Sequence, residues 1–167
     1  MTLRNSLIYA SNSGCFFFEK LLGYYTFVNV LEANTIQKYK SKSMSYLIEK
    51  AQELVNAYVR KRDSIYDGEF FICISCMKLK PKNQCNAGHF YSRGNFGSVR
   101  FNLDNIHAQC IKCNLHLHGN LIPYQKNLIK KIGQARFDNL EMMAYAKGFK
   151  HDRFMLIDII EKYKNAG

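Results

Sequence analysis

The sequence has no apolar run long enough to cross a membrane. Its most apolar stretch, Phe16 to Leu31, is interrupted by Glu19 and Lys20 and falls short of the ~20 apolar residues that a spanning helix needs. Residues 1–15 also lack a basic segment followed by an apolar core and a cleavage site, the features of a secretory signal. These absences predict a cytoplasmic protein without a membrane partner.

Acidic residues are scarce in the middle of the chain. Between Phe70 and Phe137 the only one is Asp104, whereas the same window holds ten basic residues. The whole chain carries 24 Lys and Arg against 13 Asp and Glu, a formal net charge of +11. Clustered positive charge favours a nucleic-acid partner, because phosphate neutralisation and counterion release drive much of such binding. A merely solvated basic face is the alternative.

Low-complexity tracts and internal repeats are absent too, and 47% of the 167 residues are hydrophobic, so a folded globular protein is expected. Apolar residues recur at three- and four-residue steps over 45–60, which predicts an amphipathic helix whose stripe is a packing face. Residues 64–105 are broken by Gly and Pro into short extended pieces, as in strands and loops. The first forty residues contain aromatic clusters but no chemical motif.

Helix signals return in the last third of the chain. Pro123 suits the first position of a helix, and Gly133 suits its end. Two further amphipathic stretches follow at about 137–147 and 152–164. Asp152 is a suitable N-cap for the second of them.

Four of the six cysteines have the spacing of metal ligands. They form two Cys-x-x-Cys motifs, Cys73–Cys76 and Cys110–Cys113. One pair alone would fit a redox motif, but two pairs in a reducing cytoplasm favour Zn²⁺ bound by four thiolates. Such a zinc is structural, since no coordination position stays open for water. Cys15 and Cys85 lack partners of this kind and are expected to be small buried hydrophobic residues.

Histidines and asparagines gather around the second cysteine motif. They are His89, His107, His116, His118, Asn105, Asn114 and Asn120. Each histidine alone fits a structural or surface role, but the order is informative: His89 follows the first motif, Asn105 precedes the second, and Asn114 and His116 come directly after it. This order resembles the HNH nucleases, in which a strand histidine, a central asparagine and a helix His or Asn surround one divalent cation.

Several collinear blocks resemble the phage NinG family, which is also called Rap. They are Leu54–Tyr58, Cys73–Cys76, Ala87–Phe90, Arg100–Asn102, Asn105–Cys110, Cys113–His116, Gly119–Tyr124 and Leu128–Gly133. The likeness predicts a NinG-like HNH nuclease domain with a four-cysteine zinc site over 41–140. Before it lies a segment of unknown role, 1–40, and after it a C-terminal helical segment, 141–167, that packs on the domain.

The resemblance implies a fold of the α+β class, with a zinc-stapled ββα-metal (HNH-like) core flanked by amphipathic helices. It also implies a structure-specific endonuclease that cuts branched DNA, such as Holliday junctions or strand-invasion intermediates. Such an enzyme would be encoded by a phage or prophage and would act during recombination in the bacterial host. A homodimer would match the symmetry of a four-way junction. Charge and spacing by themselves indicate only metal-assisted phosphodiester hydrolysis on a basic surface.

Phosphodiester hydrolysis gives each candidate residue a role. His89 is predicted to be the general base that activates water. Asn105 would either hold His89 by a hydrogen bond or pin the loop between the two strands. Asn114 and His116 would hold a catalytic Mg²⁺ or Mn²⁺ that acts as Lewis acid, with His118 as a reserve ligand.

Basic residues around these motifs are predicted to contact DNA phosphates. They are Arg93, Arg100, Lys112, Lys126, Lys130 and Lys131. Tyr91, Phe96 and Phe101 lie between basic residues, so their rings would either meet exposed bases at a branch point or pack in the core, the second being favoured for Phe101.

One position departs from the HNH pattern. Many HNH proteins carry an aspartate directly before the strand histidine, where this chain has Gly88, and Asn86 stands where the NinG family often has an aspartate. A hard cation would then be held by neutral ligands and phosphate alone, so activity would be weak, dependent on Mn²⁺ or a softer metal, or lost. Two alternatives follow: a zinc-stapled branched-DNA-binding protein that does not cut, and a zinc domain for protein interactions.

Overall fold

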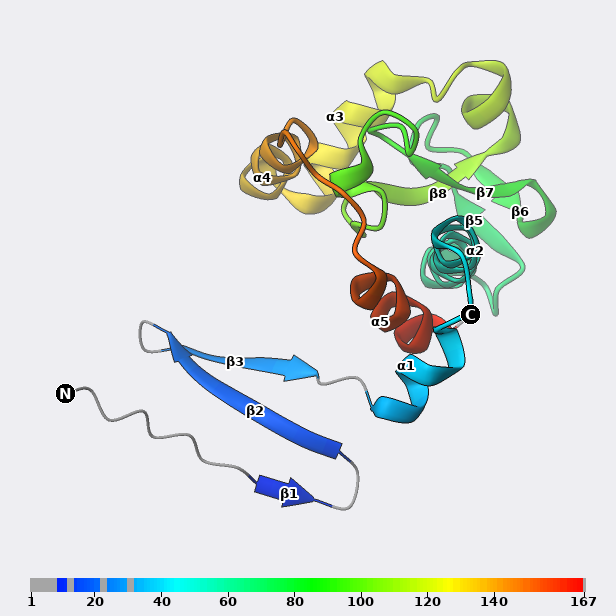
Figure 1. The fold of residues 1–167 in the computed structure, drawn as a ribbon. Helices are drawn as coiled ribbons and strands as arrows, with labels where there is room; N and C mark the ends of the chain where they lie inside the picture. Colours follow the sequence, from blue (N-terminus) through cyan, green and yellow to red (C-terminus); the bar gives the residue numbers. More distant parts are fainter. Residues whose placement is uncertain (1–8, 12–13, 22–23, 30–31, 167) are drawn as a thin grey trace. The chain divides into compact units, whose positions relative to one another are not determined.

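The computed structural model describes residues 9–11, 14–21, 24–29 and 32–166. Contacts divide the chain into two units, Met1–Lys42 and Ser43–Gly167. In the first unit an antiparallel three-stranded sheet precedes a short helix (Figure 1). Its elements are β1 (Tyr9–Ser11), β2 (Gly14–Leu21), β3 (Tyr24–Asn29) and α1 (Ala33–Tyr39). The prediction for the Cys15 side chain lies outside what the structure describes.

The second unit begins with one long helix and two small antiparallel sheets. They are α2 (Met44–Arg62), the sheet of β4 (Ser64–Ile65), β5 (Phe70–Ile72) and β6 (Leu79–Pro81), and the pair β7 (Cys85–His89) and β8 (Ile106–Cys110). Short helical turns join them: η1 (Lys82–Gln84), η2 (Gly97–Val99) and the π-helical η3 (Lys112–His116). Three helices end the chain: α3 (Leu121–Ile132), α4 (Gln134–Ala144) and α5 (Arg153–Tyr163).

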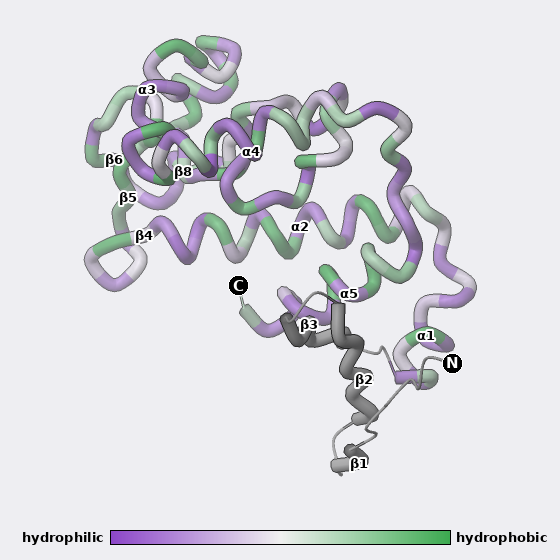
Figure 2. Tube along the Cα trace, turned by 90° about the vertical axis from the view of Figure 1, so that its left-hand side faces the viewer, coloured by the Kyte–Doolittle hydropathy of each residue, from purple (hydrophilic) through white to green (hydrophobic). Residues whose placement is uncertain are grey.

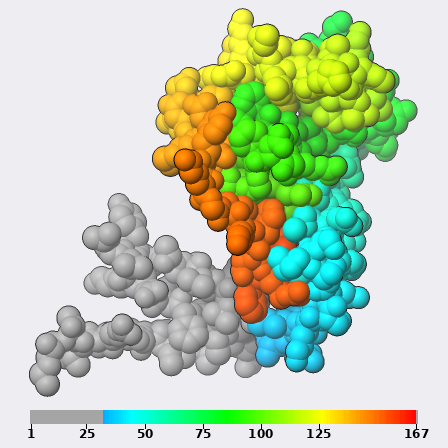
Figure 3. Space-filling model, turned by 45° about the horizontal axis from the view of Figure 1, so that its top comes forward, coloured from blue at the N-terminus to red at the C-terminus, as the bar shows by residue number. Residues whose placement is uncertain are grey.

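Helix α2 confirms the helix predicted over 45–60. Its N-terminus is capped by the Ser43 hydroxyl, which accepts a hydrogen bond from the Tyr46 N–H at 3.1 Å. Its apolar stripe is fully buried at Leu47, Ala51 and Val55, and hydrophobic and hydrophilic residues alternate along the tube (Figure 2). The stripe packs against α5 and the β7–β8 pair, and α5 lies along α2 in the space-filling view (Figure 3).

A second hydrophobic core joins α3 and α4 to the loop between β7 and β8. It contains Tyr91, Val99, Tyr124, Leu128, Phe137 and Leu140. The Tyr124 hydroxyl, fully buried, donates a hydrogen bond to the Gly88 carbonyl on β7 at 2.9 Å. This bond fixes α3 to the strand that ends in His89, so the cores on the two sides of the β7–β8 pair hold that strand in place.

The C-terminal helices follow the sequence signals closely. Asp152 caps α5, because its carboxylate accepts hydrogen bonds from the N–H groups of Phe154 and Met155. Gly133 ends α3 with φ of +85°, but α3 begins at Leu121, so Pro123 is its third residue rather than its first.

The fold is of the predicted mixed α and β class. Among the described residues, no helix has the length and apolar character to span a membrane.

Candidate metal centre and active-site pocket

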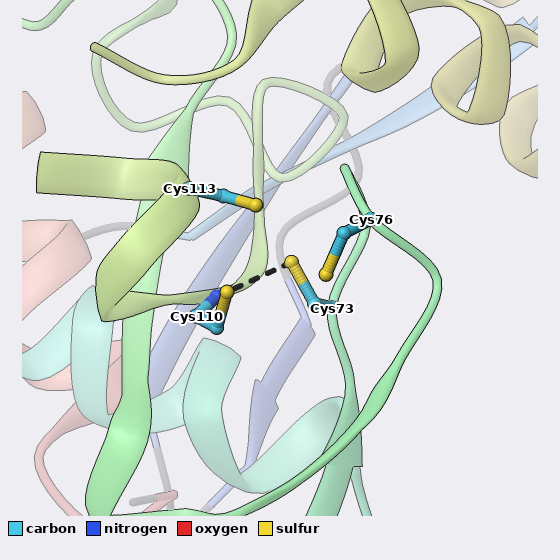
Figure 4. Close-up of side chains that lie close together, drawn as sticks. All are labelled: Cys73, Cys76, Cys110 and Cys113. Carbon is cyan, nitrogen blue, oxygen red and sulfur yellow. Dashed lines mark hydrogen bonds between the residues drawn. The ribbon is translucent and has the colours of Figure 1, made fainter. Parts of the chain in front are cut away.

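The four cysteines of the two Cys-x-x-Cys motifs meet in one cluster. Cys73 and Cys76 lie in the turn after β5, Cys110 ends β8, and Cys113 belongs to η3. Their sulfur atoms all lie within 4.8 Å of one another, and the four side chains converge in Figure 4. A tetrahedral site with bonds of about 2.3 Å needs sulfurs at such separations. The cluster could therefore bind a metal such as zinc.

Neighbouring N–H groups support the sulfurs. The Cys110 N–H donates to the Cys73 sulfur at 3.3 Å, and the side-chain amide of Asn120 donates to the Cys113 sulfur at 3.5 Å. Burial raises the pKa of the Cys73 thiol to about 12, so this thiol stays protonated unless a cation binds. A metal ion supplies the charge that removes the proton. Cys85 packs beside the cluster as a half-buried residue, close to its predicted role.

The β7–β8 hairpin positions the histidine and asparagine that the sequence singles out. Its register pairs Cys85 with Cys110 at one end and His89 with Ile106 at the other. His89 therefore ends β7, Asn105 immediately precedes β8, and η3 follows β8 directly. The chain thus runs strand, loop, strand and helical turn, with the cysteine cluster at the base.

A pocket of about 500 Å³ opens beside β7. It is called the His89 pocket here. Several of its wall residues carry polar or charged groups: Asn56, Arg60, Asn86, His89, Arg93, Asn114 and His118. Segments distant in sequence, namely α2, β7 and the residues after β8, thus contribute to one cavity.

The ring of His89 is held in one tautomer. Its Nε2 lies 3.1 Å from the Arg100 carbonyl oxygen, which can only accept, so Nε2 carries the hydrogen and Nδ1 keeps a lone pair. The Gln52 Nε2 is 3.4 Å from the same nitrogen, but both atoms then carry hydrogens and form no hydrogen bond. Burial lowers the pKa of His89 to about 4. The ring is therefore neutral at neutral pH.

Asn105 pins the loop between β7 and β8. Its fully buried side chain accepts a hydrogen bond from the Tyr91 N–H at 2.7 Å and donates to the carbonyls of Tyr91 and Val99, each at 3.0 Å. Two roles were considered for Asn105: a hydrogen bond to His89, or fixing of the loop between the two strands. These contacts are those of the second role. The pinned loop includes Arg100, whose carbonyl holds His89, so Asn105 acts on the histidine through the backbone.

The metal-ligand candidates after β8 are placed differently from expectation. Asn114 and His118 line the His89 pocket, whereas His116 is exposed outside its lining. The π-helical turn and the φ of +48° at His118 redirect the chain. The reserve ligand thus occupies the place expected of His116.

The donors in the His89 pocket suit some cations better than others. Asp and Glu are missing from its lining. Its imidazoles belong to His89 and His118, and its side-chain amides to Asn56, Asn86 and Asn114. Imidazole favours transition metals such as zinc or nickel, while Mg²⁺ and Mn²⁺ favour carboxylates. A divalent cation in this pocket would therefore be of the imidazole-preferring kind rather than Mg²⁺.

Gly88 leaves no space for the aspartate of the wider HNH pattern. A Cβ atom at this position would overlap with Gln109 Oε1 and would lie only 2.8 Å from Gln109 Cβ. The Gln109 amide is itself fixed, since its Nε2 donates to the Ser75 hydroxyl at 2.6 Å and to the Gly119 carbonyl at 2.5 Å. Gln109 thus links the first cysteine motif to the turn before α3 and fills the room that a side chain at 88 would need.

The predicted phosphate contacts divide into three groups. Arg93 lines the His89 pocket. Arg100 is half-buried and donates to the Gln52 Oε1 at 2.9 Å, while Lys131 donates to Asp63 at 3.1 Å. The remaining three are exposed lysines outside the pocket: Lys112, Lys126 and Lys130.

The aromatic candidates belong to the core rather than to a DNA surface. Tyr91 is 8% exposed and its ring packs 5.1 Å from that of Phe96. Phe101 packs against the core of α2 and α5, as the sequence favoured. The prediction from sequence did not include the polar face of α2 in the site. On this face Gln52, Asn56 and Arg60 follow one another at four-residue steps, and this spacing is the feature of the sequence that could have identified them.

Comparison with known proteins gives the chain a family. The family model for the bacteriophage lambda NinG protein matches residues 31–166, a wider range than the predicted 41–140. The chain is 43% identical over 106 residues to the NinG protein of Escherichia phage lambda, covering 64% of this chain and 49% of that protein. It is 42% identical over 106 residues to the NinG protein of Salmonella phage P22, with coverage of 64% and 49%.

The chain thus spans about half the length of the curated relatives it matches. No solved structure matches it significantly. The resemblance to NinG that the sequence blocks suggested is confirmed, and the chain belongs to the NinG family.

Proposed function

We propose that the chain is an HNH-type endonuclease that hydrolyses phosphodiester bonds in branched DNA with the help of a divalent cation. The observation that carries the proposal is the His89 pocket. It combines a neutral histidine at the end of a strand, two candidate metal ligands four residues apart after the next strand, and the cations Arg60 and Arg93. This is the set of groups that metal-assisted phosphodiester hydrolysis needs.

In the proposed reaction His89 takes a proton from a water molecule whose oxygen attacks the phosphorus, and the bond from phosphorus to the leaving oxygen breaks. Arg60 and Arg93 stabilise the negative charge on the phosphoryl oxygens. A divalent cation held by Asn114 and His118 would supply Lewis-acid assistance to the leaving oxygen. Asn105 keeps the loop, and with it His89, in the orientation that the proton transfer requires.

The branched substrate is proposed from the family resemblance, and the nucleic-acid partner is also supported by the net charge of +11. In this view the protein is encoded by a phage or prophage and works in the bacterial cytoplasm during recombination. A homodimer that matches the symmetry of a four-way junction belongs to the same proposal.

A second candidate is a branched-DNA-binding protein that does not cut. The lack of Asp and Glu in the lining of the His89 pocket favours it, because a divalent cation is bound less strongly there than among carboxylates. This candidate keeps the cysteine cluster and the basic surface, but gives His89 only a structural role.

The two candidates differ in one experiment. Purified protein is incubated with a labelled four-way junction or a linear duplex of matched sequence, with Mg²⁺, Mn²⁺ or Ni²⁺ added. The variants are His89→Ala and, as a matched control, His116→Ala, whose imidazole lies outside the pocket. We expect metal-dependent cutting of the junction that the first variant loses and the second retains. Binding of the junction without cutting under any of the metals would favour the second candidate.

A further inference from the structure

A second pocket adjoins the His89 pocket. It has a volume of about 270 Å³ and lies where the end of α2 meets β5 and the start of β7. Its main wall residues are Arg60, Lys61, Ser64, Phe70, Lys82 and Cys85. It is called the Phe70 pocket here. Arg60 lines both pockets, so a strand that passes Arg60 reaches the two in succession.

The Phe70 pocket is positively charged. Three of its wall residues are cations, and Asp and Glu do not line it. Lys82 is paired with Glu69, but Arg60 and Lys61 form no ion pair within the described part of the chain. The Asp63 carboxylate nearby in sequence is bound by Arg62 and Lys131 instead. Two cations are thus left for an anionic group such as a phosphate.

An aromatic ring lies open beside these cations. Phe70 is 39% exposed and lines the pocket, whereas the next residue, Phe71, which also belongs to the lining, is buried. Tyr66, 70% exposed, lies edge-on to Phe70 with 6.1 Å between the ring centres. An exposed ring next to cations is the combination on which single-stranded nucleic acids bind, with the base on the ring and the phosphate at the cation. In duplex DNA the bases are stacked on one another, and this ring would have no free base face to contact.

We infer that the Phe70 pocket receives an unpaired nucleotide of branched DNA, with its phosphate at Arg60 and Lys61 and its base on Phe70. The neighbouring stretch of the same strand then enters the His89 pocket past Arg60. This inference rests on the proposed function, since it takes branched DNA as the substrate. It assigns selectivity for branches to the β4–β5–β6 sheet and the end of α2, rather than to the residues that carry out hydrolysis.

The test measures binding separately from cutting. Fluorescence anisotropy with the full chain, without added divalent cation, gives the affinity for a duplex with a single-stranded flap and for the same duplex fully paired. The variants are Lys61→Glu and Phe70→Ser. Their matched controls are Lys150→Glu, an exposed lysine outside both pockets, and Ile72→Ser, a 47% exposed residue on the same strand as Phe70.

We expect Phe70→Ser to weaken flap binding by roughly 5- to 100-fold, the effect of removing a stacking ring, and to change duplex binding less than threefold. Lys61→Glu should weaken flap binding more than Lys150→Glu does. Equal losses on flap and duplex, or losses no larger than those of the controls, would overturn the inference while leaving junction cleavage by the unchanged protein as support for the proposed function. If the unchanged protein binds neither DNA, both the inference and the proposed function fail.

Discussion

Asn105 binds both backbone groups of Tyr91, accepting from its N–H at 2.7 Å and donating to its carbonyl oxygen at 3.0 Å. A third bond reaches the Val99 carbonyl, so one side chain fixes two points of the loop that joins β7 to β8. The backbone groups it binds are buried with it, away from solvent. The asparagine of the HNH-like order therefore has a structural task that is visible in the contacts themselves.

Replacing this residue is expected to destabilise the protein strongly. Asn105→Ala leaves the N–H and the carbonyl of Tyr91 without partners and removes one of the two hydrogen bonds to the Val99 carbonyl. Each buried unsatisfied group costs about 1–3 kcal/mol. The free energy of unfolding, measured by urea denaturation with zinc present, should fall by several kcal/mol. Asn95→Ala, an exposed residue of the same loop, is the control and should change it by less than about 0.5 kcal/mol. A small effect of Asn105→Ala would show that the loop is held by other contacts.

The buried histidines predict a loss of stability in acid. Burial lowers the pKa of His89 to about 4 and also lowers the pKa of His107, whereas both have ordinary values near 6.5 in the unfolded chain. The unfolded state therefore binds more protons below pH 6.5, so stability is full above that pH and falls as the pH drops toward 4. The urea midpoint should decrease between pH 7.5 and pH 5.5. His89→Gln should show a smaller decrease of the urea midpoint. An equal decrease would show that the lowered pKa of His89 does not contribute to the loss of stability in acid.

The carboxylate of Asp63 joins the end of α2 to β8 and α3. It is only 9% exposed and accepts hydrogen bonds from the Arg62 guanidinium, the Ala108 N–H and the Lys131 ammonium. Asp63→Asn should cost about 3–5 kcal/mol of stability, because it leaves the Arg62 charge without its buried partner. Lys131→Ala removes a half-exposed partner and should cost about 1 kcal/mol or less. Urea denaturation of the two variants checks the contrast, and similar costs would refute it.

Spacing in the sequence was enough to find the cysteine cluster that could bind a metal, since two Cys-x-x-Cys turns have few other uses. The order of His89 and Asn105 around those turns likewise located the hairpin. The polar face of α2 was missed because a helical pattern is recognised by its buried stripe, here Leu47 and Val55, and the polar face beside it looks like any solvated surface. Gln52 and Arg60 become site residues only when β7 packs against them.

The choice between His116 and His118 could not be made from sequence either. A regular helix after Cys113 would turn His118 away from His116, but the π-helical turn and the positive φ of His118 change the direction of its side chain. Tyr91 was similarly ambiguous, because aromatic residues among basic ones look alike whether they face DNA or a core. The local backbone places His118 rather than His116 in the pocket lining, and tertiary packing places Tyr91 in the core.

Removal of the metal should unfold the region around the cysteine cluster. The four thiols lie close together and are mostly buried, and structural zinc contributes its binding free energy to folding. A zinc chelator should lower the melting temperature and release about one zinc ion per chain, detected with a colorimetric dye. Cys76→Ser should be purified with little or no zinc, whereas Cys85→Ala, beside the cluster but outside it, should retain it. Retention of zinc by Cys76→Ser would place the ion elsewhere.

The missing carboxylate can be restored at one position but not at the other. Asn86 lines the His89 pocket, so Asn86→Asp adds a carboxylate among the metal-binding donors without a new contact in the core. This change should improve cleavage of a junction in Mg²⁺ more than in Ni²⁺, because Mg²⁺ favours carboxylate ligands.

Gly88→Asp adds the same group at the place where the wider HNH pattern has it, but there its Cβ would collide with Gln109. We expect this variant to lose stability, by about 1–3 kcal/mol or more as in other overpacked cores, and to gain no activity in Mg²⁺. Cleavage rates across a Mg²⁺ titration, together with the melting temperature, compare the two variants directly. If Gly88→Asp were stable and more active than Asn86→Asp, Gln109 would have to leave its position, and the ligand set assigned to the pocket would need to include position 88.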